Sequence, residues 1–260
     1  VLLLALRHRS LTLFTAVNPA IPAGGFIGES KSEILRGLSA HPQFVARTAL
    51  IPAADAPAEK VCAAREFMRR EGLDWPVVLK PDAGQRGSGV AVVRSQDELE
   101  TYLGAIRADA VVQEHCAGAE FGVFYYRYPG EERGRILSIT EKRMPHVTGD
   151  GVRTIEELIL ADRRAVALAE RYLNAQAEQL FRVPAPGEPV RLVELGTHCR
   201  GALFFDGRRL ITDELERAID RISRSFEGFY FGRYDIRVPA ADDLPRARNL
   251  KIIEPNVALF

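Results

Sequence analysis

The chain has 260 residues, of which 47% are hydrophobic and 27% are charged, with 35 basic side chains against 35 acidic ones. This composition is typical of a globular protein, and it excludes a disordered, collagen-like or membrane-embedded chain. The balanced charge removes the usual electrostatic basis for binding nucleic acid or an anionic membrane, because such binding depends on an excess of Lys and Arg.

The three cysteines, Cys62, Cys116 and Cys199, have no paired spacing, which argues against a disulfide framework and a zinc-ribbon site and favours a reducing compartment. We therefore expect a cytoplasmic protein. The apolar start at residues 1–6 is far shorter than the roughly 20 residues that a membrane-spanning helix needs. The chain begins without Met and stops just after a strand-like run, so we expect a fragment with an incomplete N-terminal segment at 1–24 and a truncated end at 257–260.

The first predicted helix follows Ser30, which can cap it, and a second helix is expected from about residue 58 to residue 70. Two strands, 77–79 and 90–93, flank a glycine-rich turn and resemble a hairpin. Capping boxes are expected at Ser95 with Glu98 and at Thr154 with Glu157. The later pattern predicts strands at 110–113, 121–126 and 135–140, a helical stretch broken in two at 154–180, strands near 191–195 and 202–205, a helix at 213–226, and strands at 230–238 and 250–253. This mixture of hairpins and single helices predicts an α+β fold with antiparallel sheets.

The most informative segment follows the strand that ends at Lys80. Three glycines and Ser88 come next, so the segment offers an ammonium group and several unobstructed backbone N–H groups to a polyphosphate. It is neither a Walker loop nor a dinucleotide fingerprint, since both of those open a helix. The alternative interpretation is a hairpin with a glycine-rich connection and no ligand.

A second group of polar residues lies near the end of the chain. Asp235 interrupts one apolar strand, and Glu254 and Asn256, two residues apart, share one face of another strand. Two carboxylates and an amide suit Mg²⁺ held together with nucleotide phosphates. In the alternative interpretation, Asp235 is paired with Arg233 or Arg237 on a solvated sheet face.

Together these segments resemble the ATP-grasp superfamily, in particular carboxylate–amine ligases of the D-alanine–D-alanine ligase and cyanophycin synthetase type. The resemblance covers residues 25–256. It implies an ATP-grasp fold, in which a small lid lobe at about 72–113 and a larger metal-binding lobe at about 114–256 close on ATP with Mg²⁺ or Mn²⁺.

The resemblance also assigns roles to residues that match the motifs of the family. Glu114 in Val111-Val112-Gln113-Glu114 is expected to meet adenine, and Glu120 in Gly118-Ala119-Glu120 the ribose. Arg233 is expected at the transferring phosphoryl group or the acyl intermediate, and Arg200 at a substrate carboxylate. The expected phosphate contacts are Lys31, Lys80, Arg86, Gly87, Ser88, Gly89 and Arg143, and the expected metal ligands are Asp235, Glu254 and Asn256.

The function that this resemblance implies is the ATP-dependent joining of a small-molecule carboxylate to an amine through an acyl phosphate. An ATP-grasp kinase, which transfers phosphate to a hydroxyl group, shares the same nucleotide site and stays open as an alternative. A non-catalytic ATP-binding module is a second alternative. Nucleic acid is not expected as a partner, the sequence establishes no membrane partner, and it leaves the oligomeric state open.

Overall fold

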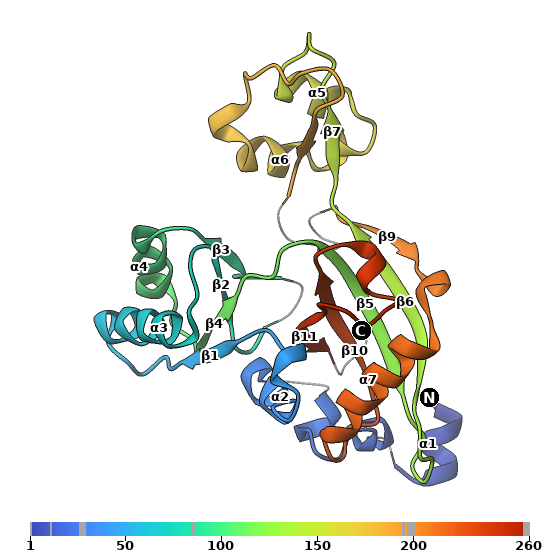
Figure 1. Cartoon of the computed structure of the whole chain (residues 1–260). Helices are drawn as coiled ribbons and strands as arrows, with labels where there is room; N and C mark the ends of the chain where they lie inside the picture. Colours follow the sequence, from blue (N-terminus) through green and yellow to red (C-terminus); the bar gives the residue numbers. More distant parts are fainter. Residues whose placement is uncertain are drawn as a thin grey trace. The chain divides into compact units, whose positions relative to one another are not determined.

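The computed structural model describes residues 2–10, 12–25, 30–84, 87–193, 196 and 201–256. Two compact units compose the chain: residues 1–140 with 206–260, and residues 141–205. Within these ranges the sheets have four, five and two strands, in the orders β1-β4-β2-β3, β11-β10-β5-β6-β9 and β7-β8. The expected α+β class with antiparallel sheets is confirmed (Figure 1).

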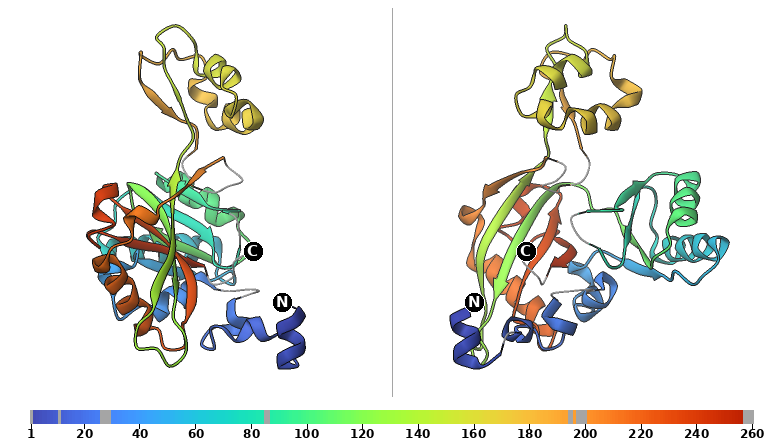
Figure 2. Two further views of the ribbon diagram at one scale, coloured as in Figure 1. Left: turned by 90° about the vertical axis from the view of Figure 1, so that its right-hand side faces the viewer. Right: turned by 180° about the vertical axis from the view of Figure 1, so that it is seen from behind.

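The four-stranded sheet forms a small body with two helices on one face (Figures 1 and 2). Its strands are β1 (Thr48–Ile51), β2 (Val77–Pro81), β3 (Ala91–Val93) and β4 (Ala110–Glu114), and its helices are α3 (Pro57–Glu71) and α4 (Gln96–Ala105). The antiparallel pairing of β2 with β3 confirms the expected hairpin. Buried Val77 and Leu79 pack beneath the helices, so alternation along β2 places Lys80 on the opposite face. β1 pairs with β4, and α3 packs against β1 and α4, so this body includes residues that precede the expected lid lobe at about 72–113.

Helix α4 begins differently from the expected capping box. The Ser95 side chain accepts a hydrogen bond from the Glu98 backbone N–H, as expected of an N-cap. The Glu98 carboxylate, however, accepts from the backbone N–H of Arg94 at 2.7 Å, one residue before the cap. The helix start is therefore stabilised by two side chains, but not by the reciprocal pair.

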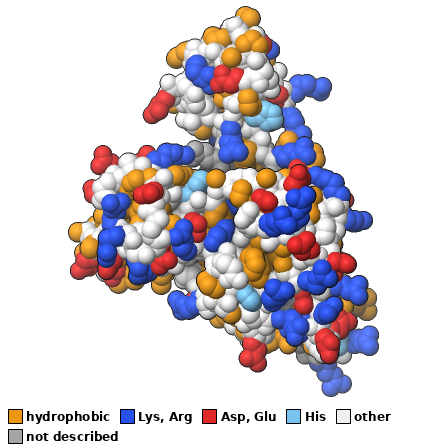
Figure 3. Space-filling view, viewed as in Figure 1, with side chains coloured by type: hydrophobic (Ala, Val, Ile, Leu, Met, Phe, Trp, Pro, Cys, Tyr) orange, Lys and Arg blue, Asp and Glu red, His pale blue; other side chains and the backbone are white. Residues whose placement is uncertain are grey.

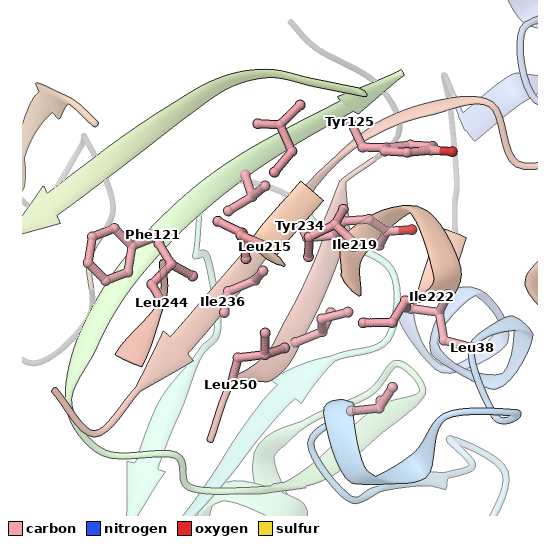
Figure 4. Close-up of a cluster of buried hydrophobic side chains, with 14 of the residues drawn as sticks. Leu38, Phe121, Tyr125, Leu215, Ile219, Ile222, Tyr234, Ile236, Leu244 and Leu250 are labelled. Carbon is pink, nitrogen blue, oxygen red and sulfur yellow. The ribbon is translucent and has the colours of Figure 1, made fainter. Parts of the chain in front are cut away.

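The five-stranded sheet carries the main core. Its strands are β5 (Ala119–Tyr126), β6 (Arg135–Arg143), β9 (Leu203–Asp206), β10 (Phe231–Val238) and β11 (Lys251–Asn256); the associated helical elements are α2 (Lys31–Gly37), η3 (Pro42–Phe44), η7 (Arg208–Leu210), α7 (Asp213–Ser225) and η8 (Ala241–Asp243). Leu215, Ile219 and Ile222 of α7 are fully buried against Tyr234 and Ile236 of β10 (Figure 4). Each such side chain contributes about 1.5–3 kcal/mol through removal from water. This packing fixes which face of β10 is inside.

One glycine shapes the connection between the two sheets of this unit. Gly118 lies between β4 and β5 with φ of +105°. A Cβ atom at this position would lie 2.1 Å from the carbonyl oxygen of Val238, at the end of β10. Only glycine allows both this backbone conformation and this close approach, so the chain can pass directly from the small sheet into β5.

The N-terminal residues also belong to this unit. They form α1 (Leu2–His8), η1 (Leu13–Ala16) and η2 (Pro22–Gly25). Asn18 is fully buried: its side-chain oxygen accepts from the backbone N–H groups of Tyr230 and Phe231 at 2.8 and 3.0 Å, and its amide donates to the Phe231 carbonyl at 2.8 Å. Asn18 thus supplies to the start of β10 the hydrogen bonds that a neighbouring strand would make.

Replacing Asn18 with Ala should lower the free energy of unfolding by about 3 kcal/mol, because two backbone donors and one acceptor lose their partner in a buried place. Urea unfolding measures the change. Asn174→Ala, at an exposed position of a helix in the second unit, is the matched control and should change stability by less than about 0.5 kcal/mol. Equal stability of the two variants would contradict this account of Asn18.

The second unit consists of a two-stranded sheet and short helices. Its elements are β7 (His146–Thr148), α5 (Ile155–Ala161), η4 (Ala165–Leu168), α6 (Ala169–Ala175), η5 (Ala177–Gln179) and β8 (Pro189–Arg191). Thr154 and Glu157 form the expected reciprocal capping box at the start of α5. The predicted helical stretch is broken, as expected, although into four short pieces. This unit has its own core, which includes Val147, Ile159 and Tyr172.

The surface agrees with the balanced charge of the sequence. On the face shown in Figure 3, basic and acidic side chains are interspersed with apolar ones. Among the described residues, every helix is too short or too polar to span a lipid bilayer.

Candidate functional site

The candidate site begins on the face of the large sheet that lies opposite α7. Tyr234 and Ile236 point into the core, so the alternating residues Arg233, Asp235 and Arg237 of β10 share the other face. Their partners on β5 are Phe124, Gly122 and Glu120 respectively. Residues that lie opposite one another on paired strands share a face. The side chain of Glu120 is therefore brought to the same face as that of Asp235.

Strand β11 adds the remaining expected ligands to this face. Glu254 lies directly opposite Asp235, and Asn256 lies directly opposite Arg233, in antiparallel register. The three expected metal ligands thus come from neighbouring positions on two paired strands. The alternative interpretation is correct in one part: Asp235 Oδ1 accepts a hydrogen bond from Arg233 Nε at 3.0 Å. Asp235 is only 7% exposed, however, so its carboxylate does not lie on a solvated face.

A β-bulge interrupts β11 next to these residues. Asp235 pairs with Glu254 but Ile236 pairs with Ile252, which leaves Ile253 without an opposite residue on β10. Bulges of this kind disrupt the ladder locally and occur frequently beside active sites. The Ile253 carbonyl instead accepts two side-chain hydrogen bonds, from Lys80 Nζ at 3.0 Å and from Gln113 Nε2 at 3.0 Å.

Lys80 therefore reaches from the small sheet to the strand that carries Glu254. Its ammonium also donates to Gln113 Oε1 at 3.1 Å, and its side chain is 4% exposed. Burial lowers the pKa of Lys80, and nearby Lys31 lowers it further, although the charges of Glu254 and Asp235 oppose the shift. A lysine whose charge is incompletely compensated suits a site that receives an anion.

Lys31, at the start of α2, connects three parts of the site. Its ammonium donates to the carbonyl oxygens of Gly84 at 2.7 Å and Asp82 at 3.3 Å, and it lies 3.7 Å from Glu254 Oε1. The carboxylate of Asp82 in turn accepts from the backbone N–H of Ser32 at 2.8 Å. The first residues of the glycine-rich loop are thus fastened to the N-terminal turn of α2, beside β11.

The described part of the glycine-rich loop contains two glycines in the left-handed region of backbone conformation. Gly87 and Gly89 have φ values of +71° and +70°, which a residue with a side chain rarely adopts. Ser88 between them is exposed. Arg86, the remaining expected phosphate contact in this loop, lies outside the described residues.

Glu114, expected to meet adenine, forms a salt bridge with Arg47 through its carboxylate. Both oxygens accept from the guanidinium at 3.0 Å, and Oε2 also accepts from the Arg47 backbone N–H at 3.1 Å. Burial alone would raise the pKa of Glu114, but the Arg47 hydrogen bonds outweigh it and the pKa is lowered. Lys251, whose ammonium lies 3.9 Å from Glu114, donates to the Val45 carbonyl at 3.4 Å. These contacts connect β4 with the start of β11.

Glu120, expected at the ribose, is 6% exposed and pairs with Arg237 from the neighbouring strand. Its Oε2 accepts from Arg237 Nη2 at 2.8 Å and from Nε at 3.2 Å. Arg237 Nη1 also donates to the Cys116 carbonyl at 2.9 Å. This ion pair holds the Glu120 carboxylate beside the connection between β4 and β5.

The expected metal ligands fit a divalent cation by their chemistry. Asp235 and Glu254 supply carboxylate oxygens, and Arg233 Nε is 3.0 Å from Asp235 Oδ1. The Asn256 Nδ2 atom is buried and has no hydrogen-bond partner in the described part of the chain, so no bond to this atom fixes the orientation of the amide. Hard oxygen donors of this kind suit Mg²⁺. No set of three or more His, Cys, Asp or Glu side chains that could hold a metal occurs within the described ranges, so the donor set depends on the Asn256 amide.

Two further expected residues, Arg143 and Arg200, do not belong to the described part of the first unit. Arg143 belongs to the second unit, where it pairs with Glu141 at 2.7 Å and lies 4.5 Å from the centroid of the Phe205 ring. Arg200, the expected contact of a substrate carboxylate, lies outside the described residues.

Sequence reasoning did not nominate Gln113, which the structure places at the centre of the site. Gln113 is 2% exposed, bonds both Lys80 and Ile253, and donates to Thr48 Oγ1 at 3.0 Å. The available signal was a long polar side chain in the apolar run of β4, since a buried amide needs hydrogen-bond partners.

The chain was compared with protein-family models, with curated protein sequences and with solved structures. No protein-family model matches the chain. A segment of 91 residues, 33% of the chain, is 32% identical to cyanophycin synthetase of Geminocystis herdmanii (strain PCC 6308) and spans 10% of that protein.

Two solved structures of ligases are similar over most of the chain. VanG D-Ala:D-Ser ligase from Enterococcus faecalis is 14% identical, with 88% of this chain and 52% of its own chain covered and a TM-score of 0.48. A bifunctional glutathione synthetase from Pasteurella multocida is 16% identical, with 88% and 33% covered and a TM-score of 0.46. The chain thus spans a tenth to about half of the length of these proteins. Part of this chain is thus similar in sequence to cyanophycin synthetase, one of the two kinds of ligase that its motifs resemble. The chain has the α+β fold with antiparallel sheets that was expected.

Proposed function

We propose that this chain is the nucleotide-binding part of an ATP-dependent ligase that joins a small-molecule carboxylate to an amine through an acyl phosphate. The proposal rests above all on one observation: the Lys80 ammonium is bonded to the Ile253 carbonyl, directly beside the opposed pair Asp235 and Glu254. Cationic groups that suit a polyphosphate are thereby next to carboxylates that suit its metal ion. We further propose the cytosol as its compartment, since Cys62 and Cys116 are unpaired.

In this proposal the protein acts mainly by positioning and by charge. The ammonium groups of Lys31 and Lys80 exchange carbonyl partners for phosphate oxygens, and the backbone N–H groups at Gly87–Gly89 add neutral donors. Asp235, Glu254 and Asn256 would hold Mg²⁺, which neutralises phosphate charge when it is bound. Arrangement of the reactants in line accounts for much of the rate in such reactions.

The chemistry has two steps with a balanced exchange of bonds. A carboxylate oxygen of the first substrate attacks the γ-phosphorus and ADP leaves, which gives an acyl phosphate. The amine nitrogen of the second substrate then attacks the acyl carbon, inorganic phosphate leaves, and the nitrogen loses a proton. Arg233 is 36% exposed at its side chain and lies next to Asp235, and it would donate hydrogen bonds to the negative charge that develops in either step.

The decisive experiment measures ADP release by the full chain in the presence of MgATP and a panel of amino acids and other amines and carboxylates. A ligase releases ADP and phosphate only when both substrates are present, and mass spectrometry shows a product equal to their sum minus one water. A phosphoester product would instead identify a kinase. Thermal stabilisation by MgATP with no turnover against any pair of substrates would identify a binding module and contradict the proposal.

A further inference from the structure

The glycine-rich loop is fastened at its far end by a residue that belongs to none of the motifs above. Tyr102, on the last turns of α4, donates a hydrogen bond from its hydroxyl to the carbonyl oxygen of Gly89 at 2.6 Å. Gly89 is the final glycine of the loop, immediately before the hairpin resumes at Val90 and β3. The bond therefore joins a helix of the small body to the point at which the loop returns to the sheet.

The position of Tyr102 is itself well fixed. Helix α4 is anchored in the core of the small body by Leu99 and Leu103, both fully buried, and the Tyr102 ring packs partly buried against the same core. Burial raises the pKa of Tyr102 to about 12, so the hydroxyl remains protonated and a donor at any physiological pH. A donor on a rigid helix loses little freedom when it forms this bond.

The two ends of the loop also touch each other at this place. Gly89 has φ of +70°, and a Cβ atom on it would lie 2.8 Å from the ring of Pro81, the last residue of β2. At the near end, Lys31 bonds the carbonyl groups of Asp82 and Gly84. The described residues of the loop are thus held from both sides, by a lysine that the proposed function assigns to phosphate and by a tyrosine with no such role.

We propose that Tyr102 is a positioning residue for nucleotide binding, which sets the backbone of Gly87–Gly89 through its bond to the Gly89 carbonyl. The inference rests on the proposed function, because the positioned N–H groups are those offered to the phosphates of ATP. Loss of the hydroxyl leaves the ring and the helix intact but frees the end of the loop. A single neutral hydrogen bond of this kind, at a partly exposed place, changes a local equilibrium by about threefold to tenfold.

The test uses Tyr102→Phe in the full chain, with Tyr128→Phe as a matched control, since Tyr128 is 62% exposed on the turn between β5 and β6. The first measurement needs no nucleotide. Trypsin can cut after Arg86, within the loop, and under dilute protease the rate follows the population of open loop. Mass spectrometry of the fragment pair 1–86 and 87–260 should show cleavage about threefold to tenfold faster in Tyr102→Phe than in the wild type or the control.

The second measurement separates positioning from a general structural role. In Tyr102→Phe the KM for ATP should rise about threefold to tenfold while kcat stays within about twofold, and the unfolding midpoint should match that of the control. Equal cleavage rates in Tyr102→Phe and the wild type would overturn the inference, as would a lowered unfolding midpoint with an unchanged KM. If the wild type fails to bind MgATP, the proposed function fails, and the cleavage comparison still decides whether Tyr102 holds the loop.

Discussion

The Asp235→Asn variant should turn over at least about 100-fold more slowly than the wild type while it still binds ATP. Asparagine keeps the shape of the side chain and an oxygen that can accept from Arg233 Nε, so the sheet should be preserved. What is lost is the negative charge opposite Glu254, at the place where the proposed metal ion faces the phosphates. Loss of one preorganised charged group in such a site costs about a hundredfold or more in rate.

The measurement for Asp235→Asn is ADP release at a series of Mg²⁺ concentrations, with ATP binding followed separately by calorimetry. Asp242→Asn, which removes a carboxylate from an exposed position of η8 in the same unit, controls for the change in net charge and should behave as the wild type. The variant should require more Mg²⁺ for its residual activity. Full turnover of Asp235→Asn at ordinary Mg²⁺ would refute the metal assignment.

Lys80→Met should weaken ATP binding by about 10- to 100-fold, since a charged hydrogen-bond donor to phosphate is worth about 1.5–3 kcal/mol. The Ile253 carbonyl keeps its bond from Gln113, so β11 retains a connection to the small sheet. Isothermal calorimetry with MgATP measures the loss. Lys80→Arg keeps the positive charge and should bind ATP more tightly than Lys80→Met; equal affinity of Lys80→Met and the wild type would refute the assignment of Lys80 to phosphate.

The lowered pKa of Lys80 also predicts the direction in which the free energy of unfolding changes with pH. Burial lowers the pKa of Lys80 in the folded chain below its ordinary value of 10.5. Between the lowered pKa and 10.5, the unfolded chain binds more protons than the folded one, so this group makes the free energy of unfolding rise as pH rises through that window. Below the folded pKa the burial penalty is fully present.

Urea unfolding from pH 7 to pH 10.5 checks this sign. Other groups titrate in the same range, so the informative quantity is the difference between the wild type and Lys80→Met, which cannot gain or lose this proton. The wild type should gain stability relative to the variant as pH rises. A difference that is constant with pH, or one that falls, would contradict a lowered pKa for Lys80.

The arrangement along each strand could be predicted from the sequence because it depends on local periodicity. Residues two apart share a face of a strand, which placed Glu254 with Asn256, and the hairpin that flanks the glycine-rich loop was read from two short apolar runs. The residues that make up the small body could not be predicted from local periodicity. β1 pairs with β4 across some 60 residues, and no local signal announces such a pairing.

The sequence also could not predict which polar groups would find hydrogen-bond partners in the folded chain. The segment from Lys251 to Asn256 reads as a regular strand, and nothing in it marks Ile253 as the extra residue of a bulge. The bulge involves partners that are distant in the sequence: the register with β10 leaves out Ile253, and Lys80 and Gln113 donate to its carbonyl. For the same reason the sequence could not show that Arg47 occupies the carboxylate of Glu114, since the pairing depends on two strands that meet in the folded chain.

The gathering of Lys31, Lys80 and Lys251 around β11 has a practical consequence for spectroscopy. The sequence contains only five lysines against thirty arginines, so these three are most of its side-chain amines. Incorporation of ¹³C-labelled lysine during expression would therefore give a sparse NMR spectrum in which three of the five lysine side chains come from this one region. Few chains offer such a built-in set of reporters, because ordinary surfaces are covered with lysine and would mask the signals of interest.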